Sequence, residues 1–265
     1  MKLTTTLFTL LCLFRVSQTF AFTLSTSNGA AFNIDGVDEI RINVEDGGGT
    51  CNLGLTPNEI LDMALVAADR FWNRAPTSAL KLGRGDVVNV ASFESADLCS
   101  PDSPCTPTAT FKHSMGLLIG CNENTSNFPT NSILGLSVPT VLNGKNIQTA
   151  NVLLNGTSGS RFLSLSYDEQ IATIAHEMGH ALGLGHSPVN DSLMYYQSVP
   201  VRNDLGADDI NGISYLYPKT QVVDLNCGSL PFDPRQGPKP PGGGLAILLG
   251  AAMLYSLYKR SKHSA

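Results

Sequence analysis

Alternating apolar and polar positions predict strands in the first half of the chain. Residues 38–46 (DEIRINVED) alternate as a half-buried strand does. The apolar runs 86–93 (DVVNVASF) and 115–121 (MGLLIGC) predict two more strands. Two longer runs, 132–141 and 146–155, are separated by an Asn-Gly pair, which is typical of a tight turn. The pattern therefore predicts five strands before residue 156.

Three segments instead repeat their apolar residues every three to four positions, as helices do. The first begins with a capping sequence, TPNE, at Thr56 and ends before Pro76. The second begins with another capping sequence, SYDE, at Ser166. The third, ADDINGISYLYP, covers residues 207–218. Strands interspersed with capped helices indicate a mixed α and β domain.

The last turns of the second helix and the residues after it carry unusual chemistry, in the stretch HEMGHALGLGHS at 176–187. His176 and His180 lie four residues apart, so both imidazoles project from one helix face and can reach one metal ion. Gly183 stands where the helix should end, so the chain can turn back and bring His186 to the same ion. Three neutral imidazoles leave the fourth tetrahedral position open for water, as catalytic zinc requires. Glu177 points about 100° around the helix and can serve as the general base for that water.

This stretch resembles the metzincin signature, H-E-x-x-H-x-x-G-x-x-H followed by a methionine turn. Within that clan it is most similar to the matrixins, the matrix-metalloproteinase-like family. Matrixins have serine after the third histidine, here Ser187, and a Leu-Met-Tyr turn, here around Met194. They continue with Asp-Asp-Ile-x-Gly-Ile, here residues 208–213. The resemblance covers residues 36–218 and is specific over 166–217.

The resemblance implies an α/β (α+β) metzincin catalytic domain: a twisted five-stranded mixed sheet, three helices, and a zinc cleft beneath an antiparallel edge strand. Substrate would pair with that strand, which the resemblance places at Leu134, Gly135 and Leu136. Met194 would form the apolar floor beneath the zinc, and Asp209 would bond back to the methionine turn. Each assignment has an alternative. The strand could be an ordinary sheet edge, Met194 could simply pack in the core, and Asp209 could stand at a solvated helix N-terminus.

Departures from the family limit the metals that are expected. Animal matrixins hold a second, structural zinc with histidines, one of them in the edge strand, where this chain has Leu136. We therefore expect one catalytic Zn²⁺ and no second structural zinc. The acidic, glycine-rich calcium loops of the family are also missing, so the sequence gives no support for a structural Ca²⁺.

The two ends of the chain predict export. Residues 1–21 are typical of a signal peptide, with cleavage expected after Ala21, and the catalytic domain is expected over 22–225. A Pro/Gly-rich linker at 226–244 precedes 245–265, an apolar segment with a basic end. This arrangement resembles the GlyGly-type C-terminal sorting signals of Gram-negative bacteria, which a rhomboid-type protease removes. A permanent membrane anchor is the alternative.

Cysteine positions agree with an oxidising compartment but leave most of the pairing open. Cys99 and Cys105 flank a turn-prone loop and are expected to pair. The other cysteines of the exported chain, Cys51, Cys121 and Cys227, can form one further bond at most. The net charge of −5 and the lack of a long basic run give no support for nucleic-acid binding.

The sequence therefore predicts a secreted or surface-attached zinc endopeptidase that hydrolyses peptide bonds through a zinc-activated water with Glu177 as general base. Its expected partners are protein or peptide substrates, the membrane at least transiently, and a sorting protease. We expect a monomer. The alternative function is an inactive, zinc-stabilised extracellular binding or adhesion module, which would have no need of a base beside its ligands.

Overall fold

The computed structural model describes residues 22–27, 30–31, 33–34, 38–46, 52–90, 93–95, 116–142, 146–197 and 202–219. The chain divides into two units, 1–220 and 221–265, and every described residue belongs to the first unit. Among the described residues, no helix combines the length and apolarity needed to cross a membrane. Several predictions concern residues outside this part of the chain: the signal peptide, the Cys99–Cys105 pair, the linker and the C-terminal segment.

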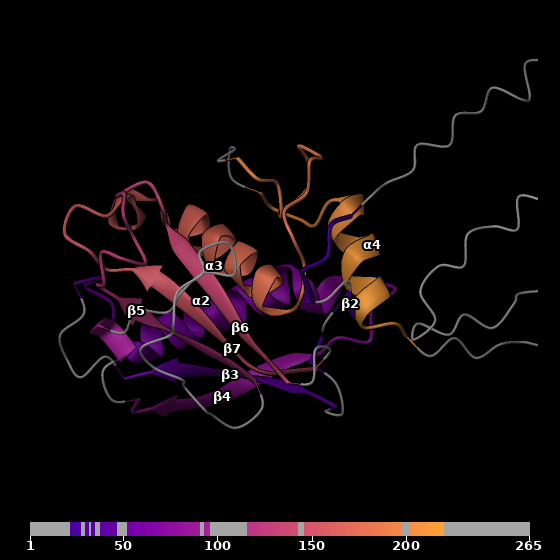
Figure 1. Ribbon diagram of the computed structural model, residues 1–265, viewed down its shortest axis with the longest axis horizontal. Helices are drawn as coiled ribbons and strands as arrows, with labels where there is room; N and C mark the ends of the chain where they lie inside the picture. Colours follow the sequence, from indigo (N-terminus) through magenta and orange to yellow (C-terminus); the bar gives the residue numbers. More distant parts are fainter. Residues whose placement is uncertain are drawn as a thin grey trace, which may run out of the picture. The chain divides into compact units, whose positions relative to one another are not determined.

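Five strands form the central sheet in the order β4, β3, β5, β7, β6 (Figure 1). Their bounds are Leu82–Val88 for β4, Ile40–Glu45 for β3, Gly116–Asn122 for β5, Asn146–Asn155 for β7 and Gly135–Leu142 for β6. The first four run parallel, and β6 pairs antiparallel with β7 at the edge. A separate two-stranded hairpin joins β1, Thr26–Ser27, to β2, Ala30–Ala31.

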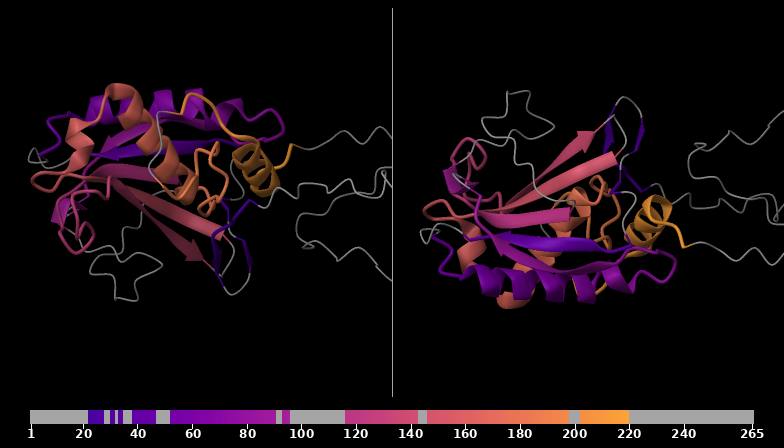
Figure 2. Two further views of the ribbon diagram at one scale, coloured as in Figure 1. Left: turned by 90° about the horizontal axis from the view of Figure 1, so that it is seen from above. Right: turned by 90° about the horizontal axis from the view of Figure 1, so that it is seen from below.

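In the part of the chain that the structure describes, three α-helices accompany the sheet: α2, Pro57–Arg70; α3, Tyr167–Ala181; and α4, Ala207–Leu216. Short 3₁₀ turns occur at Trp72–Arg74, Phe93–Ser95 and Arg161–Ser164. Figure 2 shows α2 and α3 side by side on one face of the sheet. The predicted fold class, an α/β domain with a mixed five-stranded sheet and three helices, is thus confirmed.

The main core lies between the sheet and these two helices. Side chains of alternate strand residues, such as Ile42, Leu117 and Val152, meet the apolar stripes of α2 and α3. A smaller cluster on the opposite face is built around Phe93 and Leu118. Because β3 has neighbours on both sides and both faces are covered, only one of its residues is exposed. The half-buried strand expected at 38–46 is therefore an interior one.

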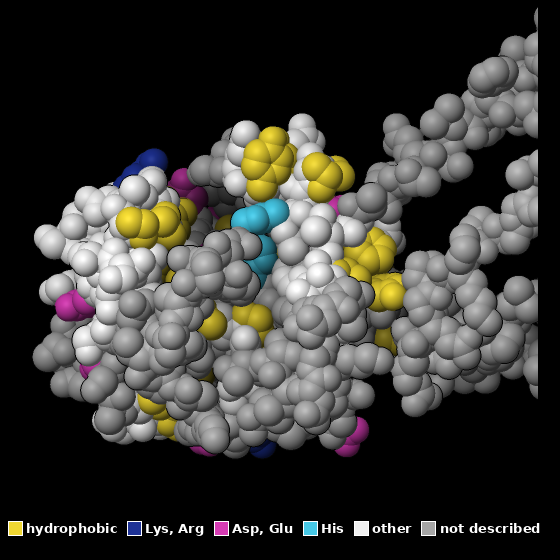
Figure 3. All heavy atoms as spheres, viewed as in Figure 1, with side chains coloured by type: hydrophobic (Ala, Val, Ile, Leu, Met, Phe, Trp, Pro, Cys, Tyr) yellow, Lys and Arg dark blue, Asp and Glu magenta, His cyan; other side chains and the backbone are white. Residues whose placement is uncertain are grey.

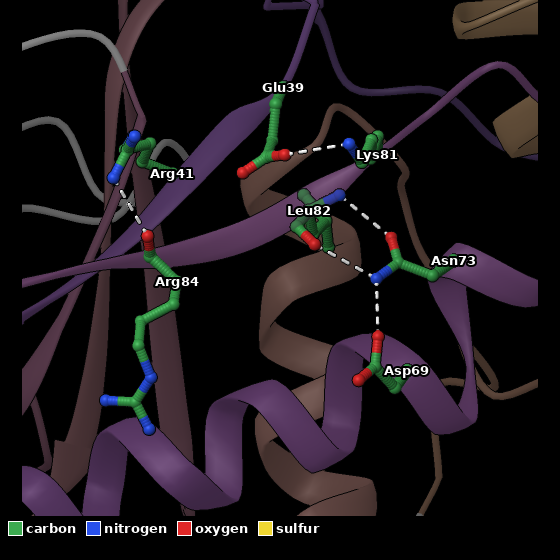
Figure 4. Close-up of polar contacts among 7 residues, drawn as sticks. All are labelled: Glu39, Arg41, Asp69, Asn73, Lys81, Leu82 and Arg84. Carbon is green, nitrogen blue, oxygen red and sulfur yellow. Dashed lines mark hydrogen bonds and ion pairs between the residues drawn. The ribbon is translucent and has the colours of Figure 1, made fainter.

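The strand predicted at 86–93 begins earlier, at Leu82. Two glycines early in this strand weaken its apolar pattern, and the structure shows why they are there. A methyl group on Gly83 would lie 1.8 Å from a Glu39 carboxylate oxygen. Asn73 fixes the strand start: it accepts a hydrogen bond from the Leu82 amide (2.8 Å) and donates one to the Leu82 carbonyl (3.0 Å), as Figure 4 shows.

Both predicted capping boxes are present. At the start of α2, the Thr56 amide donates to Glu59 at 2.7 Å. At the start of α3, the Ser166 amide donates to Glu169 at 2.8 Å. The indole of Trp72 donates to a carbonyl inside α3 at 2.9 Å, which joins the two helices. These contacts set the position of α3 against the core. Cys121 in β5 is disulfide-bonded, and its partner lies outside the described residues.

Candidate metal centre

The structure brings the three motif histidines together. Their metal-ligating nitrogens lie within 4.8 Å of one another. The Nε2 atoms of His180 and His186 face each other at 3.2 Å. Two nitrogens bound to one zinc at about 2.0–2.1 Å, in tetrahedral geometry, lie about 3.3 Å apart. This donor set therefore fits a zinc ion. In the space-filling view, the histidine side chains reach the surface with apolar side chains on either side (Figure 3).

Backbone carbonyls orient two of these imidazoles. His176 Nδ1 donates to the Leu193 carbonyl at 2.7 Å, and His180 Nδ1 donates to the Leu184 carbonyl at 2.9 Å. Because a carbonyl can only accept, Nδ1 carries the hydrogen and the lone pair of Nε2 remains for a metal. Burial lowers the pKa of His176 to about 4 and the pKa of His180 well below its ordinary value. Both rings are therefore neutral ligands at physiological pH.

The chain turns after α3 as the sequence predicts. Gly183 has φ of 105°, in the left-handed region that glycine adopts at little cost. The Leu184 amide returns to the Gly179 carbonyl at 3.0 Å and closes the end of the helix. This reversal allows His186, six residues after His180, to face the same point as the two helical histidines.

Glu177 lies in a buried position beside the histidines, with 8% of its surface exposed. Burial raises the pKa of this carboxyl to about 8, so in the absence of a nearby cation it is largely protonated at neutral pH. A divalent cation beside it favours the carboxylate. A buried carboxylate next to a metal is well placed to accept a proton from a water molecule.

Strand β6 approaches Glu177 directly. A methyl group on Gly135 would lie 2.7 Å from the Glu177 Cγ atom, so only glycine leaves room for this side chain. The Ser137 hydroxyl donates to the Glu177 carbonyl at 2.6 Å. Leu134 and Leu136 are half-buried, and Leu136 packs against the smaller cluster on the other face of the sheet. Of the three residues assigned to the edge strand, Gly135 thus lies against the motif helix, Leu136 faces the other side of β6, and Leu134 directly precedes the strand.

The pairing of β6 with β7 determines which of its backbone groups face outward. The Asn155 amide donates to the Leu134 carbonyl at 3.1 Å. Because bonded and unbonded positions alternate in an antiparallel pair, the register of β6 with β7 directs the polar backbone groups of Gly135, Ser137 and Pro139 away from β7. Pro139 stands where its missing N–H costs no bond within the sheet. The outward groups offer an extended peptide an edge with which to pair.

Met194 is 2% exposed and packs against the motif helix. Its sulfur would lie 2.3 Å from a methyl group on Gly179, so the glycine in HEMGH leaves space for this methionine. The Ser187 amide donates to the Met194 carbonyl at 2.7 Å, which ties the methionine turn to the residue after the third histidine. The structure thus places Met194 in the core against α3 at Gly179, the residue before His180.

Asp209 at the start of α4 holds the methionine turn. Its carboxylate accepts hydrogen bonds from the Leu193 amide (2.6 Å), the Met194 amide (3.1 Å), the Gly206 amide (2.8 Å) and the Ser192 hydroxyl. Burial raises the pKa of this carboxyl, and the four hydrogen bonds oppose the rise. Since the Leu193 carbonyl orients His176, the turn connects Asp209 to a histidine of the motif.

Sequence reasoning did not identify several residues that support the site. Ser137, Ser192 and the carbonyls of Leu184 and Leu193 all position the motif or its turn. Backbone acceptors leave no trace in a sequence, because every residue has a carbonyl. Ser137 did leave a signal: it is a polar residue at an inward position of a largely apolar strand.

Comparison with known proteins points the same way. A family model described as Peptidase_M10: Matrixin matches residues 155–218. Metalloendoproteinase 2-MMP of Arabidopsis thaliana is 46% identical over 59 residues, which are 21% of this chain and 16% of that protein. Matrix metalloproteinase-20 of Homo sapiens is 27% identical over 186 residues, 68% of this chain and 32% of that protein.

A probable matrix metalloproteinase, 095L, of Invertebrate iridescent virus 3 is 46% identical over 56 residues, 20% of this chain and 15% of that protein. The matched segments thus span about a third or less of these relatives. A solved structure titled "GM1 bound form of the ECX AB5 holotoxin" aligns with a TM-score of 0.44 and 16% identity, over 74% of this chain and 88% of that chain. The matrixin match and the matrix metalloproteinase relatives support a zinc metalloendopeptidase family.

Proposed function

We propose that this protein is an exported zinc-dependent endopeptidase. The observation that carries the proposal is the convergence of three imidazoles, with the Nε2 atoms of His180 and His186 3.2 Å apart, beside the buried carboxyl of Glu177. A structural zinc site has four protein ligands and no need of an adjacent base. Among the described residues, the metal-binding cluster consists of the three histidines, and no cysteine, carboxylate or further histidine joins it as a fourth ligand.

The residues of this chain divide the work of peptide hydrolysis. His176, His180 and His186 hold the metal, which when bound polarises a carbonyl and acidifies a water molecule. Glu177 takes a proton from the attacking water and delivers it to the nitrogen of the leaving amine as the C–N bond breaks. The outward backbone groups of β6 hold the substrate extended across the site.

Export and attachment are part of the proposal. The predicted signal peptide and the apolar C-terminal segment suit a protease that acts on extracellular proteins or peptides, either released from the cell or held at its surface. A monomer suffices, because all the residues assigned to the site come from one chain. Nucleic acid is not a proposed partner.

Metal content and peptide cleavage test the function together. The purified protein should contain about one zinc per chain, and a strong chelator should abolish cleavage of a peptide library. Glu177→Gln should keep the zinc and lose about 10²–10⁴-fold in turnover, because the positioned base is removed and the ligands remain. Asn190→Ala, an exposed change in the loop after the third histidine, is the matched control. Full turnover in Glu177→Gln would refute the mechanism, and a zinc-loaded protein that cleaves nothing would point to the binding module.

A further inference from the structure

The loop between the second and third histidines, residues 182–185, is bound by segments from both ends of the described domain. Its Gly183 carbonyl accepts a hydrogen bond from the Ser25 amide at 2.9 Å, and its Leu184 carbonyl accepts one from the Ser25 hydroxyl at 3.1 Å. The Gly185 amide donates to the Thr23 carbonyl at 2.9 Å. Residues 23–25 therefore run antiparallel to the loop and pair with it.

These hydrogen bonds provide donors for backbone carbonyls of the loop that have no hydrogen-bond partner within α3. The amides of Leu182, Gly183 and Leu184 all return to carbonyls within α3, at 2.9, 3.0 and 3.0 Å. The carbonyls at the end of a helix have no such partners and need donors from elsewhere. The Tyr217 hydroxyl donates to the Leu182 carbonyl at 2.9 Å, and Ser25 donates to the carbonyls of the two residues that follow Leu182.

One of these carbonyls also orients a motif histidine. The Leu184 oxygen accepts from His180 Nδ1 at 2.9 Å as well as from the Ser25 hydroxyl. A carbonyl oxygen has two lone pairs, so both donors can be accommodated. The Ser25 amide holds the preceding peptide group through the Gly183 carbonyl. Ser25 thus restrains the direction of the oxygen that keeps the His180 ring in place.

The segment that carries Ser25 is anchored independently of the histidines. The Phe22 ring lies 5.6 Å from the Tyr215 ring of α4, measured between centroids. Thr23 packs so close to the loop that a methyl group on Gly185 would lie 2.9 Å from its Cγ2 atom. A support that is packed against α4 and the loop can hold its ligand before any metal arrives, and such pre-organisation improves affinity.

We propose that Ser25 is a positioning residue for zinc binding, acting on His180 through the Leu184 carbonyl. The inference rests on the proposed zinc-dependent function. It adds to that function a residue that lies outside the histidine motif and contributes to metal affinity. Outer partners of metal-bound histidines change affinity by about 10–100-fold when they contact the ligand directly. Ser25 acts one bond further away, so a smaller effect is expected.

Zinc affinity, measured by competition with a chromogenic chelator, tests this role without any use of peptide cleavage. Ser25→Ala in the full chain should raise the zinc dissociation constant by about three- to tenfold, below the direct effect of an outer partner. It should also shift the visible absorption of the cobalt-substituted protein, because the ligand geometry changes. Ser25→Thr keeps the hydroxyl and should restore both values.

Tyr217→Phe is the matched comparison, because it removes a hydroxyl from the neighbouring carbonyl, which orients no histidine. It should lower the melting temperature of the metal-free protein and leave the zinc dissociation constant within about twofold. Ser25→Ala with unchanged zinc affinity would overturn the proposal. Equal weakening by Ser25→Ala and Tyr217→Phe would do the same, since general loosening would then explain both. If Ser25→Ala weakens zinc binding but the protein cleaves no peptide, the proposed function fails and the role of Ser25 stands.

Discussion

The two sides of the site are built in different ways. On one side, α3 and the chain that follows contribute side chains: three imidazoles, the Glu177 carboxyl, Met194 and Asp209. On the other side, β6 contributes its backbone, the space left by Gly135 and a single hydroxyl, that of Ser137. The matrixin model matches residues 155–218 and thus the first side only. Metal chemistry restricts residue identity closely, whereas a strand edge can be made from many sequences.

This contrast has a consequence for function. Substitutions on the helix side remove a metal ligand or a proton acceptor, so they should lower metal binding or the rate of the chemical step. Substitutions on the strand side leave the backbone groups in place, and they should matter only where they change a contact with α3, as at Gly135 and Ser137. The experiments below test the contrast, starting with the largest expected effect.

Loss of His186 should be the most severe change. His186→Ala removes one of three imidazoles, and the remaining pair cannot complete a catalytic zinc site. Zinc content should fall well below one per chain, and peptide cleavage should fall to background. Metal analysis after dialysis and a peptide assay give both values. Asn190→Ala, four residues further along the chain and exposed, should retain wild-type zinc. Stoichiometric zinc in His186→Ala would remove this residue from the ligand set.

Gly135→Ala should be the one severe change on the strand side. The added methyl group would lie 2.7 Å from the Glu177 Cγ atom, so the base has to move. A displaced base should lower turnover by about ten- to a hundredfold, less than its complete removal, while zinc content stays at one per chain. Leu136→Ala is the control, because that side chain packs on the opposite face. Equal losses in the two variants would mean that strand stability, and not contact with Glu177, controls activity.

The same contrast explains how much could be predicted from the sequence. The histidine cluster, both capping boxes and the order of strands and helices follow from spacings of a few residues, which act locally. The start of β4 at Leu82 could not be predicted in this way. Gly83 and Gly85 interrupt the apolar pattern there, because neighbouring atoms leave no room for a side chain at either position. The support for His180 by Ser25 joins residues 155 positions apart through a backbone carbonyl, and no residue type signals it.

Methylation of substrate amides should test the backbone of β6 without any change to the protein. An N-methyl group on a substrate residue that pairs with Gly135 or Ser137 removes one hydrogen bond, worth about 0.5–1.5 kcal/mol. Each such methyl group should therefore lower kcat/KM by roughly two- to tenfold. Methyl groups on alternate residues, whose amides point away from the strand, are the control. If every position responds equally, the substrate does not bind as an added strand.

The smallest effect should come from the capping box of α3, which supports the helix side at the end away from His180. Hydrogen bonds from the Ser166 hydroxyl and amide lower the pKa of the Glu169 carboxyl. A carboxyl whose pKa is lower in the folded than in the unfolded protein stabilises the fold above its unfolded pKa, about 4.3, and this contribution is lost as the pH falls through the folded value. Glu169→Gln should therefore have a slightly lower melting temperature than wild type at pH 7, and the two curves should converge near pH 3. Glu59→Gln, in the matching box of α2, should behave alike because Thr56 lowers the pKa of that carboxyl. A gap that stays constant from pH 7 to pH 3 would show that the carboxylate charge plays no part in capping.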